Sequence, residues 1–539
     1  MIHNAIARSL ALCLLVVCLA SMAAADEAPV WPGEVPENHA GEGPFERLIL
    51  RGPIMIDGTG APPSGPVDIV IEGNRIREIR NVAMGGVFVD DSRRPQADEN
   101  TRELDLSGQY ILPGFVDLHG HVGGQGQGVS ADYVFRLWLA HGVTSVRDPG
   151  SGAGIDWMLD HQQKSADNRI LAPRLHVYVT FGRGHDGPIT TPEQARQWVR
   201  DIASAGADGI KFFGARPDVL EAAIDEAGEV GIGTTMHLAQ LHVTRTHMLD
   251  AARMGLGSME HWYGLPESMF TDRRVQNYPH DYNYSDEQDR FAEAGRLWRQ
   301  AAGPDDPRWH EVRDELIALD FTIVPTLNIY QANRDLMRER TAEWHPLYTK
   351  PALWDFFEPS RTAHGSYWFD WTTAIEIDWK DNYRRWMAFL NDYKNHGGRV
   401  ATGSDSGFIY KTYGFGFVSE LELLQEAGFH PLEVIRSATL SGAEALGVDG
   451  ELGTIEVGKL ADLVVVPDNP LQNFKLLYGT GAIRVDADNR VYRAGGVSYT
   501  IKDGVIFDAV ELRAELRERV REAWEGENRV LRQPGLTPD

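Results

Sequence analysis

The sequence predicts an α/β protein: a (β/α)8 TIM barrel with a small β-sandwich built from the N- and C-terminal segments. In the middle of the chain, short apolar runs alternate eight times with helical stretches, as parallel strands joined by helices do. Before and after this region, short β-type runs are separated by Gly and Pro, as hairpins require. The chain has 539 residues, 42% of them hydrophobic, which is enough for several structural units.

The barrel strands are predicted from these apolar runs in chain order. They cover residues 115–118, 143–147, 175–181, 209–213, 233–237, 257–261, 321–327 and 399–403. Helical patterns follow several of them, for example at 192–205 and 217–230. This rhythm favours one closed barrel.

The sandwich is predicted from β-type runs on both sides of the barrel. These runs are 48–50, 68–72, 75–79 and 110–112 before it, and 463–466, 491–493, 499–502 and 505–507 after it. The expected domains are a signal peptide (1–25), a linker (26–44), the first sandwich part (45–112), the barrel (113–445), the second sandwich part (446–509), and a C-terminal amphipathic helix with its tail (510–539).

The first residues are typical of an export signal. Arg8 is followed by a short apolar run and by small residues at Ala23 and Ala25, which predicts cleavage after Ala25. Both cysteines, Cys13 and Cys18, lie inside this segment, so the mature chain would contain none. We therefore expect a periplasmic or secreted protein without stable membrane insertion, whose metal ligands would be His, carboxylate and Lys.

Composition excludes several classes of protein. The net charge is −26, so the surface repels nucleic acid and anionic lipid. The mean hydropathy of −0.32 excludes a polytopic membrane protein. We expect a small-molecule partner, and a homo-oligomer is left open.

Residues 265–398 form an aromatic-rich insertion around the seventh strand. They contain 8 of the 14 Trp and 8 of the 17 Tyr. Loops at the C-terminal face of a barrel build the active site, which favours a lid or pocket wall. An oligomer contact or a separate small core explains the aromatic content equally well, because aromatics bury well anywhere.

Metal-ligand side chains follow the predicted strands. His119 and His121 are two residues apart at the end of an apolar strand, so both can face one cation. Four further strand ends carry Lys211, His237, His261 and Asp405. Because these ends meet above the barrel, the six groups are predicted to share one site.

Lys211 is unusual in such a set, because an ammonium is a poor metal ligand. A buried neutral lysine can react with carbon dioxide to form a carbamate, whose two oxygens can bridge two metals. The alternatives are a lysine that reaches the surface or pairs with a carboxylate.

Several segments together resemble the amidohydrolase superfamily, most of all its imidazolonepropionase-related and prolidase-like (Xaa-Pro or Xaa-Arg dipeptidase-like) members. They are 113–121 (PGFVDLHGH), 142–148 (GVTSVRD), 206–211 (GADGIK), the strand ending at His237, 258–261 (SMEH), 403–405 (GSD) and 450–466 (GELGTIEVGKLADLVVV). The resemblance runs from about residue 48 to residue 507 and is weakest over the insertion. As an ordered set, these motifs are specific.

The resemblance implies a metal-dependent hydrolase with two divalent ions, usually zinc. His119, His121 and Asp405 would hold one ion, His237 and His261 the other, and carboxylated Lys211 would bridge them. A metal-bridging hydroxide would attack the substrate, and Asp405 would transfer the proton.

The pattern also departs from parts of the family. Deaminases are expected to show His-x-x-Glu at the fifth strand, but Gln240 stands three residues after His237, which disfavours ring deamination. His185, in 182–187 (GRGHDG), resembles a substrate-contacting turn of the prolidase-like group, although an ordinary loop histidine is an equal alternative. Further substrate-binding candidates are Arg147, Arg183 and Tyr263.

We therefore predict an exported amidohydrolase that cleaves a C–N amide bond of a dipeptide or N-acyl amino acid. One alternative is an esterase, lactonase or phosphotriesterase using the same centre. Another is a metal-free binding or scaffold protein on this fold.

Overall fold

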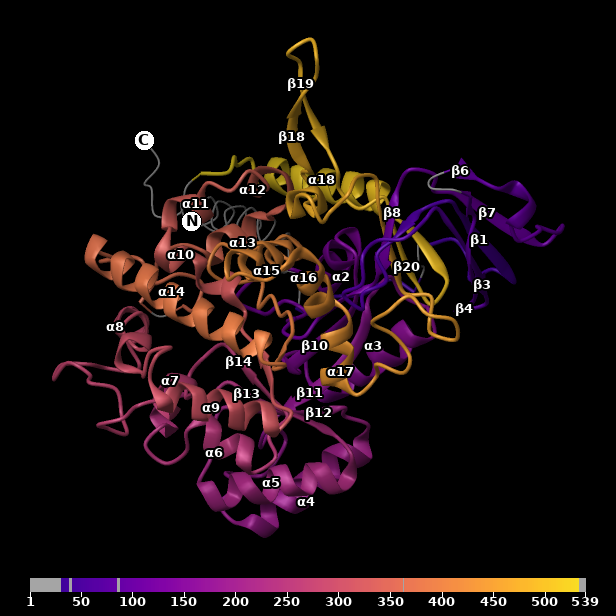
Figure 1. The fold of residues 1–539 in the computed structure, drawn as a ribbon. Coiled ribbons are helices and arrows are strands. Elements are labelled where there is room, and N and C mark those ends of the chain that lie inside the picture. The colour runs from indigo at the N-terminus through magenta and orange to yellow at the C-terminus, as the bar shows by residue number, and fades with distance from the viewer. Residues whose placement is uncertain (1–30, 38–40, 85–87, 362, 533–539) are drawn as a thin grey trace, which may run out of the picture.

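A computed structural model of the chain describes residues 31–37, 41–84, 88–361 and 363–532 (Figure 1). The predicted signal peptide, residues 1–25, lies outside the described residues and stays a prediction. Every helix in the described part is too short or too polar to span a membrane.

Eight parallel strands form the central sheet, one at each predicted position. They are β9 (Phe115–Asp117), β10 (Val143–Gly150), β11 (Arg174–Thr180), β12 (Gly209–Phe212), β13 (Gly233–Met236), β14 (Ser258–Glu260), β15 (Thr322–Val324) and β16 (Arg399–Val400). Each pairs with the next in chain order, from β9 to β16.

The two ends of this sheet are joined by the residues that follow β9 and β16. The Leu118 amide donates to the Thr402 carbonyl at 3.0 Å, and the Asp405 amide donates to the His119 carbonyl at 2.7 Å. Gly403 permits the close approach, since a Cβ there would lie 2.9 Å from the His119 Cβ. The predicted barrel class is confirmed, and its last strand end is bonded to its first.

Helices follow most of the barrel strands. They are α2 (Ala131–Ala140), α3 (Ile155–Ala166), α4 (Pro192–Ala205), α5 (Pro217–Val230), α6 (Met248–Arg253), α15 (Phe415–Glu426), α16 (Pro431–Ala438) and α17 (Leu440–Leu446). The bounds of α4 follow from its sequence. Thr191 and Gln194 form a capping box, Pro192 occupies the first turn, and Gly206 ends the helix in a left-handed conformation.

The insertion is mostly helical and packs its aromatic side chains together. Its helices are α7 (Leu265–Ser268), α8 (Glu287–Ala294), α9 (Pro307–Ala318), α10 (Gln331–Arg334), α11 (Leu336–Arg340), α12 (His345–Tyr348), α13 (Pro351–Phe356) and α14 (Thr373–Asn395). Trp379 and Trp386 on α14 are fully buried against Trp262 at the end of β14. Much of the insertion is therefore core.

Two sheets form the sandwich beside the barrel. One has the order β4-β3-β1-β7 and the other β2-β8-β17-β20-β21. Their strands are β1 (Arg47–Arg51), β2 (Ile54–Met55), β3 (Val67–Glu72), β4 (Arg75–Asn81), β7 (Thr101–Asp105), β8 (Tyr110–Pro113), β17 (Leu463–Val466), β20 (Tyr499–Lys502) and β21 (Val505–Asp508). Leu50, Ile69, Ile111, Val465 and Ile501, from both sheets and both ends of the chain, share one buried apolar cluster.

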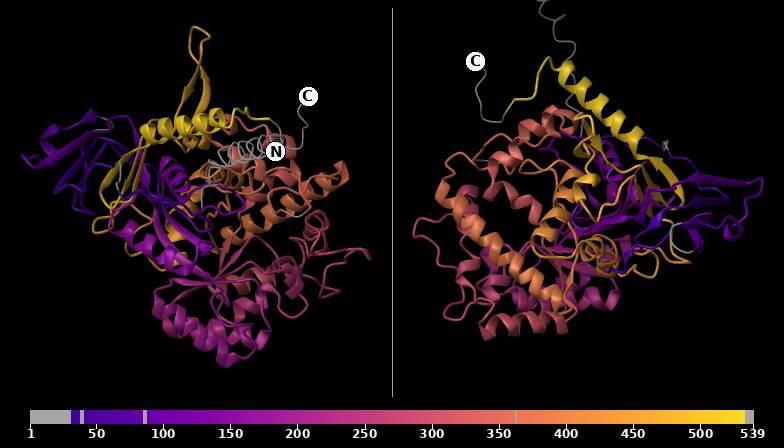
Figure 2. Two further views of the ribbon diagram at one scale, coloured as in Figure 1. Left: turned by 180° about the vertical axis from the view of Figure 1, so that it is seen from behind. Right: turned by 45° about the horizontal axis from the view of Figure 1, so that its top comes forward.

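The predicted strand at 491–493 does not join the sandwich. It belongs to β19 (Val491–Ala494), which pairs with β18 (Ala482–Val485) in a separate hairpin. This hairpin projects from the body next to α18 (Ala509–Gly526) (Figures 1 and 2). Its Val and Tyr favour a β-strand, yet Val491 is 69% exposed because nothing in the described chain covers this ribbon.

The C-terminal helix forms where the amphipathic pattern predicts it. Asp508 caps α18, which buries Leu512, Leu516, Val520 and Trp524. Arg519 pairs with Asp132 of α2 at 2.7 Å, which ties the helix to the barrel.

Candidate metal centre

A cavity of about 410 Å³ lies above the carboxyl ends of the barrel strands. All six groups predicted as metal ligands line it: His119, His121, Lys211, His237, His261 and Asp405. They come from the ends of β9, β12, β13, β14 and β16, so the parallel sheet brings together residues that are far apart in the sequence.

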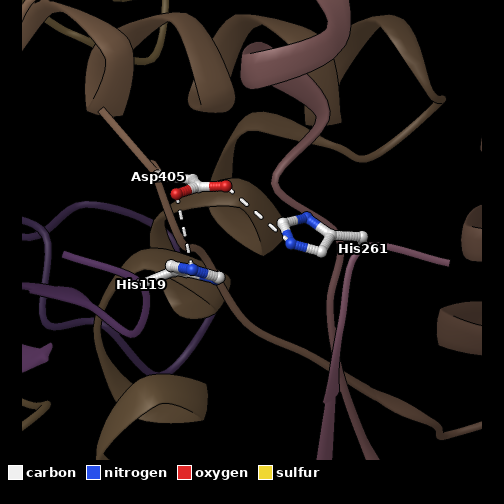
Figure 3. A group of neighbouring side chains, drawn as sticks. All are labelled: His119, His261 and Asp405. Carbon is white, nitrogen blue, oxygen red and sulfur yellow. Dashed lines mark ion pairs between the residues drawn. The ribbon is translucent and has the colours of Figure 1, made fainter. Parts of the chain in front are cut away.

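Asp405 lies at the centre of the histidines. Its Oδ1 is 3.2 Å from His121 Nε2 and 3.4 Å from His119 Nε2, and its Oδ2 is 3.8 Å from His261 Nε2. Figure 3 shows His119 and His261 on either side of the carboxylate. The possible ligand atoms of these three residues all lie within 4.8 Å of one another, close enough to share a cation.

The environment favours the neutral form of His119, His237 and His261 and the ionised form of the Asp405 carboxyl. His121 differs, because burial lowers its pKa but the neighbouring Asp405 outweighs burial and raises it. Burial lowers the pKa of His119 and His237 well below the usual value, and it lowers the pKa of His261 to about 4. Burial would raise the pKa of Asp405, but His119, His121 and His261 outweigh it and hold that pKa well below its usual range. Neutral imidazoles and an ionised carboxylate are the forms that bind metal.

Lys211 is buried at the end of β12, 2% exposed. Its Nζ lies 5.4 Å from the centre of the Phe213 ring. Within the described chain, no carboxylate pairs with this lysine, and it does not reach the surface. Burial lowers its pKa, which favours the neutral amine.

Three consecutive strand ends carry left-handed backbone at non-glycine residues. These are His261 (φ 61°), Thr326 (φ 49°) and Asp405 (φ 48°). Such conformations cost free energy and persist where the surrounding structure imposes them. Here they turn the His261 and Asp405 side chains into the cavity, and Thr326 Oγ1 hydrogen-bonds to His261 Nδ1.

Glu260 is a functional residue that the sequence analysis missed. Its Oε2 lies 2.8 Å from His119 Nδ1, and its Oε1 accepts from Arg147 Nη2 at 2.6 Å and from Thr235 Oγ1. A carboxylate on the far nitrogen of a ligand histidine fixes the ring and leaves Nε2 for the metal. Glu260 stands next to His261 on a strand whose other residues are uncharged, and this position could have identified it from the sequence.

The structure corrects the prediction for Arg147. The side chain is fully buried below the cavity, where it bonds to Glu260, to the Leu118 carbonyl at 2.7 Å and to Ser258 Oγ at 3.1 Å. It faces into the barrel because alternate residues of β10 point inward. Arg147 therefore positions Glu260 and does not contact substrate.

The other three substrate-binding candidates are absent from the described lining of the cavity. Arg183 is exposed, and His185 bonds through Nδ1 to the Gly187 carbonyl at 2.9 Å. Tyr263 is buried behind the histidines, with its ring 5.3 Å from that of His237. Their roles in binding substrate stay predictions.

The insertion provides most of the remaining wall of the cavity. Its contributions are Tyr284, Glu287, Arg290, Phe291, Ile329, Tyr330 and His364. A wall was one of the predicted roles of the insertion, but the tryptophans at 344, 354, 368 and 371 are not part of the lining.

Residues 383–506 match the family described as "Amidohydrolase family". The predicted resemblance to amidohydrolases is confirmed. Among curated amidohydrolase-like relatives, an adenine deaminase of Methanoculleus marisnigri is 47% identical over 104 residues, covering 18% of this chain and 20% of the relative. An imidazolonepropionase of Symbiobacterium thermophilum is 38% identical over 68 residues, covering 12% of this chain and 16% of the relative. The chain thus aligns with about a fifth or less of these curated proteins.

Solved structures share the fold over most of this chain. A Xaa-Pro dipeptidase with bound methionine aligns with a TM-score of 0.56 at 19% identity, covering 86% of this chain and 100% of that one. Bottromycin amidohydrolase aligns with a TM-score of 0.58 at 20% identity, covering 89% and 91%. At these identities the likeness establishes the fold.

Proposed function

We propose that the protein is a metal-dependent amidohydrolase that cleaves a C–N amide bond of a dipeptide or an N-acyl amino acid. The observation that carries this proposal is the convergence of four histidines, one aspartate and a buried, unpaired lysine in one cavity. A binding or scaffold protein would have no need for this donor set.

The donor chemistry fits a centre of two ions. His119, His121 and Asp405 would hold one divalent ion, His237 and His261 the other, with zinc the expected metal. Lys211 would bridge them as a carbamate, formed when the neutral amine adds to carbon dioxide and releases one proton. The ions would polarise the scissile carbonyl and lower the pKa of water.

Residues of the chain itself have the remaining roles in the proposed reaction. Glu260 orients His119, and Arg147 holds Glu260. Asp405 accepts the proton of the attacking water and passes it to the leaving amine as the C–N bond breaks. The rings of Phe291, Tyr330 and Phe408 keep bulk water from the reacting carbonyl.

Ring deamination is the less favoured reaction on this fold. Gln240 is buried and does not belong to the cavity lining, so it supplies neither the charge nor the position of a catalytic acid. Ester, lactone or phosphotriester hydrolysis stays the alternative use of the centre, because the same water would attack those groups.

Export to the periplasm or to the medium is part of the proposal. It is supported by the leader-like residues 1–25. Mass spectrometry of the exported protein tests it, because the mature chain should begin near Asp26.

Metal analysis combined with a substrate screen tests the activity. The purified protein should contain two divalent ions per chain and hydrolyse members of a dipeptide and N-acetylamino acid library. Asp405→Asn should lower kcat by about 10²–10⁴-fold. A metal-free wild-type protein, or hydrolysis of esters with no amide turned over, would contradict the proposal.

A further inference from the structure

One cation in the cavity wall, Arg290, forms no ion pair with an acid of the described chain. Arg290 lies on α8 and lines the cavity together with His237 and His261. Its guanidinium lies close to two aromatic rings, with Cζ 4.8 Å from the centre of the Tyr284 ring and 5.0 Å from that of Phe291. Its Nε is buried and has no hydrogen-bond partner in the described chain.

Neighbouring arginines of the same segment behave differently. Arg296 Nε donates to Asp378 at 2.7 Å, and Arg299 pairs with the same carboxylate. The segment therefore provides an acid for its structural arginines, but none of the described acids forms an ion pair with Arg290.

Glu287, one turn before Arg290 on α8, is held by another residue. Its Oε1 bonds to His364 Nδ1 at 2.5 Å, and its buried Oε2 has no hydrogen-bond partner among the described residues. His364 thus holds Glu287 in the wall, away from a salt bridge with Arg290.

A half-buried guanidinium that forms no ion pair is costly unless a ligand supplies a carboxylate. The planar fork of arginine matches the two oxygens of a carboxylate, and the two neighbouring aromatic rings restrict its orientation.

We propose that Arg290 binds the carboxylate of the substrate and selects free acids over their neutral derivatives. The substrate class is then amides that carry a free carboxylate. This inference rests on the proposed amide hydrolysis and names the residue that recognises the substrate.

Matched acids and amides test this role in the metal-loaded enzyme. In the first pair, the best hydrolysed N-acetylamino acid, whose carboxylate lies on the amine side of the scissile bond, is compared with its carboxamide. In the second pair, an N-succinylamine, whose carboxylate lies on the acyl side, is compared with the N-butyrylamine. Arg290→Gln should lower kcat/KM for the acid of one pair by about 10–100-fold, because a charge-assisted hydrogen bond is lost. The neutral member of that pair should change by less than about threefold.

Two further variants serve as controls. Arg273→Gln, which changes an exposed arginine outside the lining that pairs with Asp272, should leave both pairs unchanged. Arg290→Lys keeps the charge but loses the fork, so it should retain an intermediate preference for the acid. Equal metal content in all variants shows that the centre is intact. If Arg290→Gln does not fold, Arg290→Lys carries the test, and an unchanged acid preference in that variant would overturn the proposal.

A binding measurement separates this inference from the proposed activity. Saturating N-acetylamino acids or N-succinylamine should raise the melting temperature of the wild type but not of Arg290→Gln. Amide hydrolysis with equal acid preference in wild type and Arg290→Gln would overturn the role of Arg290 and leave the proposed function standing. An acid-specific shift without hydrolysis would support Arg290 and overturn the proposed function. No shift and no hydrolysis would overturn both.

Discussion

Two groups of residues line the same cavity and reach it in different ways. Five strand ends of the barrel place the histidines, Lys211 and Asp405, and the register of the sheet fixes their positions. Tyr284, Glu287 and Arg290 come from one segment of the insertion, on α8 and the loop before it. The strand ends hold side chains suited to metal binding, whereas this part of the wall holds aromatic rings, Glu287 and Arg290, which forms no ion pair in the described chain. The sheet register therefore positions the candidate metal ligands, and a separate segment of the chain supplies the wall beside them.

Replacing Lys211 gives the largest effect expected on the strand-end side. In Lys211→Ala, two ions would lose their bridge and repel each other, so metal occupancy should fall and activity should drop by more than about 100-fold. Elemental analysis and kinetics measure both. Added acetate or propionate should restore part of the activity in a saturable way. A variant that keeps its metals and its rate would favour a mononuclear site.

Glu260→Gln tests whether Glu260 orients the ligand His119. The amide cannot hold His119 in the same tautomer as firmly, so metal affinity should fall about 10–100-fold. Arg147 would also lose its buried partner, which should lower the free energy of unfolding by about 3 kcal/mol. Metal titration and chemical denaturation measure the two effects. Thr234→Val, which changes a buried polar residue of β13 outside the Glu260 cluster, serves as the control, and equal metal affinity in both variants would contradict the role of Glu260.

The pH dependence of stability tests a histidine of the insertion that lies outside the cavity. Burial lowers the pKa of His345 to about 4, while the unfolded chain titrates near 6.5. The stabilisation is therefore complete above pH 6.5 and is lost as the pH falls toward 4, by up to about 3 kcal/mol. Denaturation of the metal-free protein at several pH values measures it. His345→Gln should flatten this slope, and an unchanged slope would show that His345 does not contribute to it.

The smallest expected effect distinguishes the cavity wall of the insertion from its buried core. Tyr284→Ala removes part of the wall, so KM should rise several-fold while the metals and the melting temperature stay as in the wild type. Trp386→Ala, buried in α14, should instead lower the free energy of unfolding by about 3–5 kcal/mol with little change in KM for the folded fraction. If both variants altered only stability, the wall would have no part in substrate binding.

The sequence predicted best what depends on periodicity. Eight apolar runs located the barrel strands within a few residues, and His119, His121 and Asp405 were identifiable because they directly follow such runs. Arg147 was misjudged because a charged residue in an apolar strand can point into the barrel or above it, and one register step decides which. Arg290 was missed because no periodic pattern relates an eight-residue helix in a long insertion to a distant strand end. The run at 491–493 contains strand-forming residues, and only tertiary covering distinguishes an exposed hairpin from a strand of the sandwich.

The pairing of β8 with β17 has a consequence for how the chain reaches its native state. Leu112 and Val464 are partners in this ladder although about 350 residues separate them. Contacts between such distant segments form late and slow folding, because a long loop must close before they contribute. A growing chain could not complete the sandwich until most of its last hundred residues had been made. The sandwich would then form only when nearly the whole chain is present.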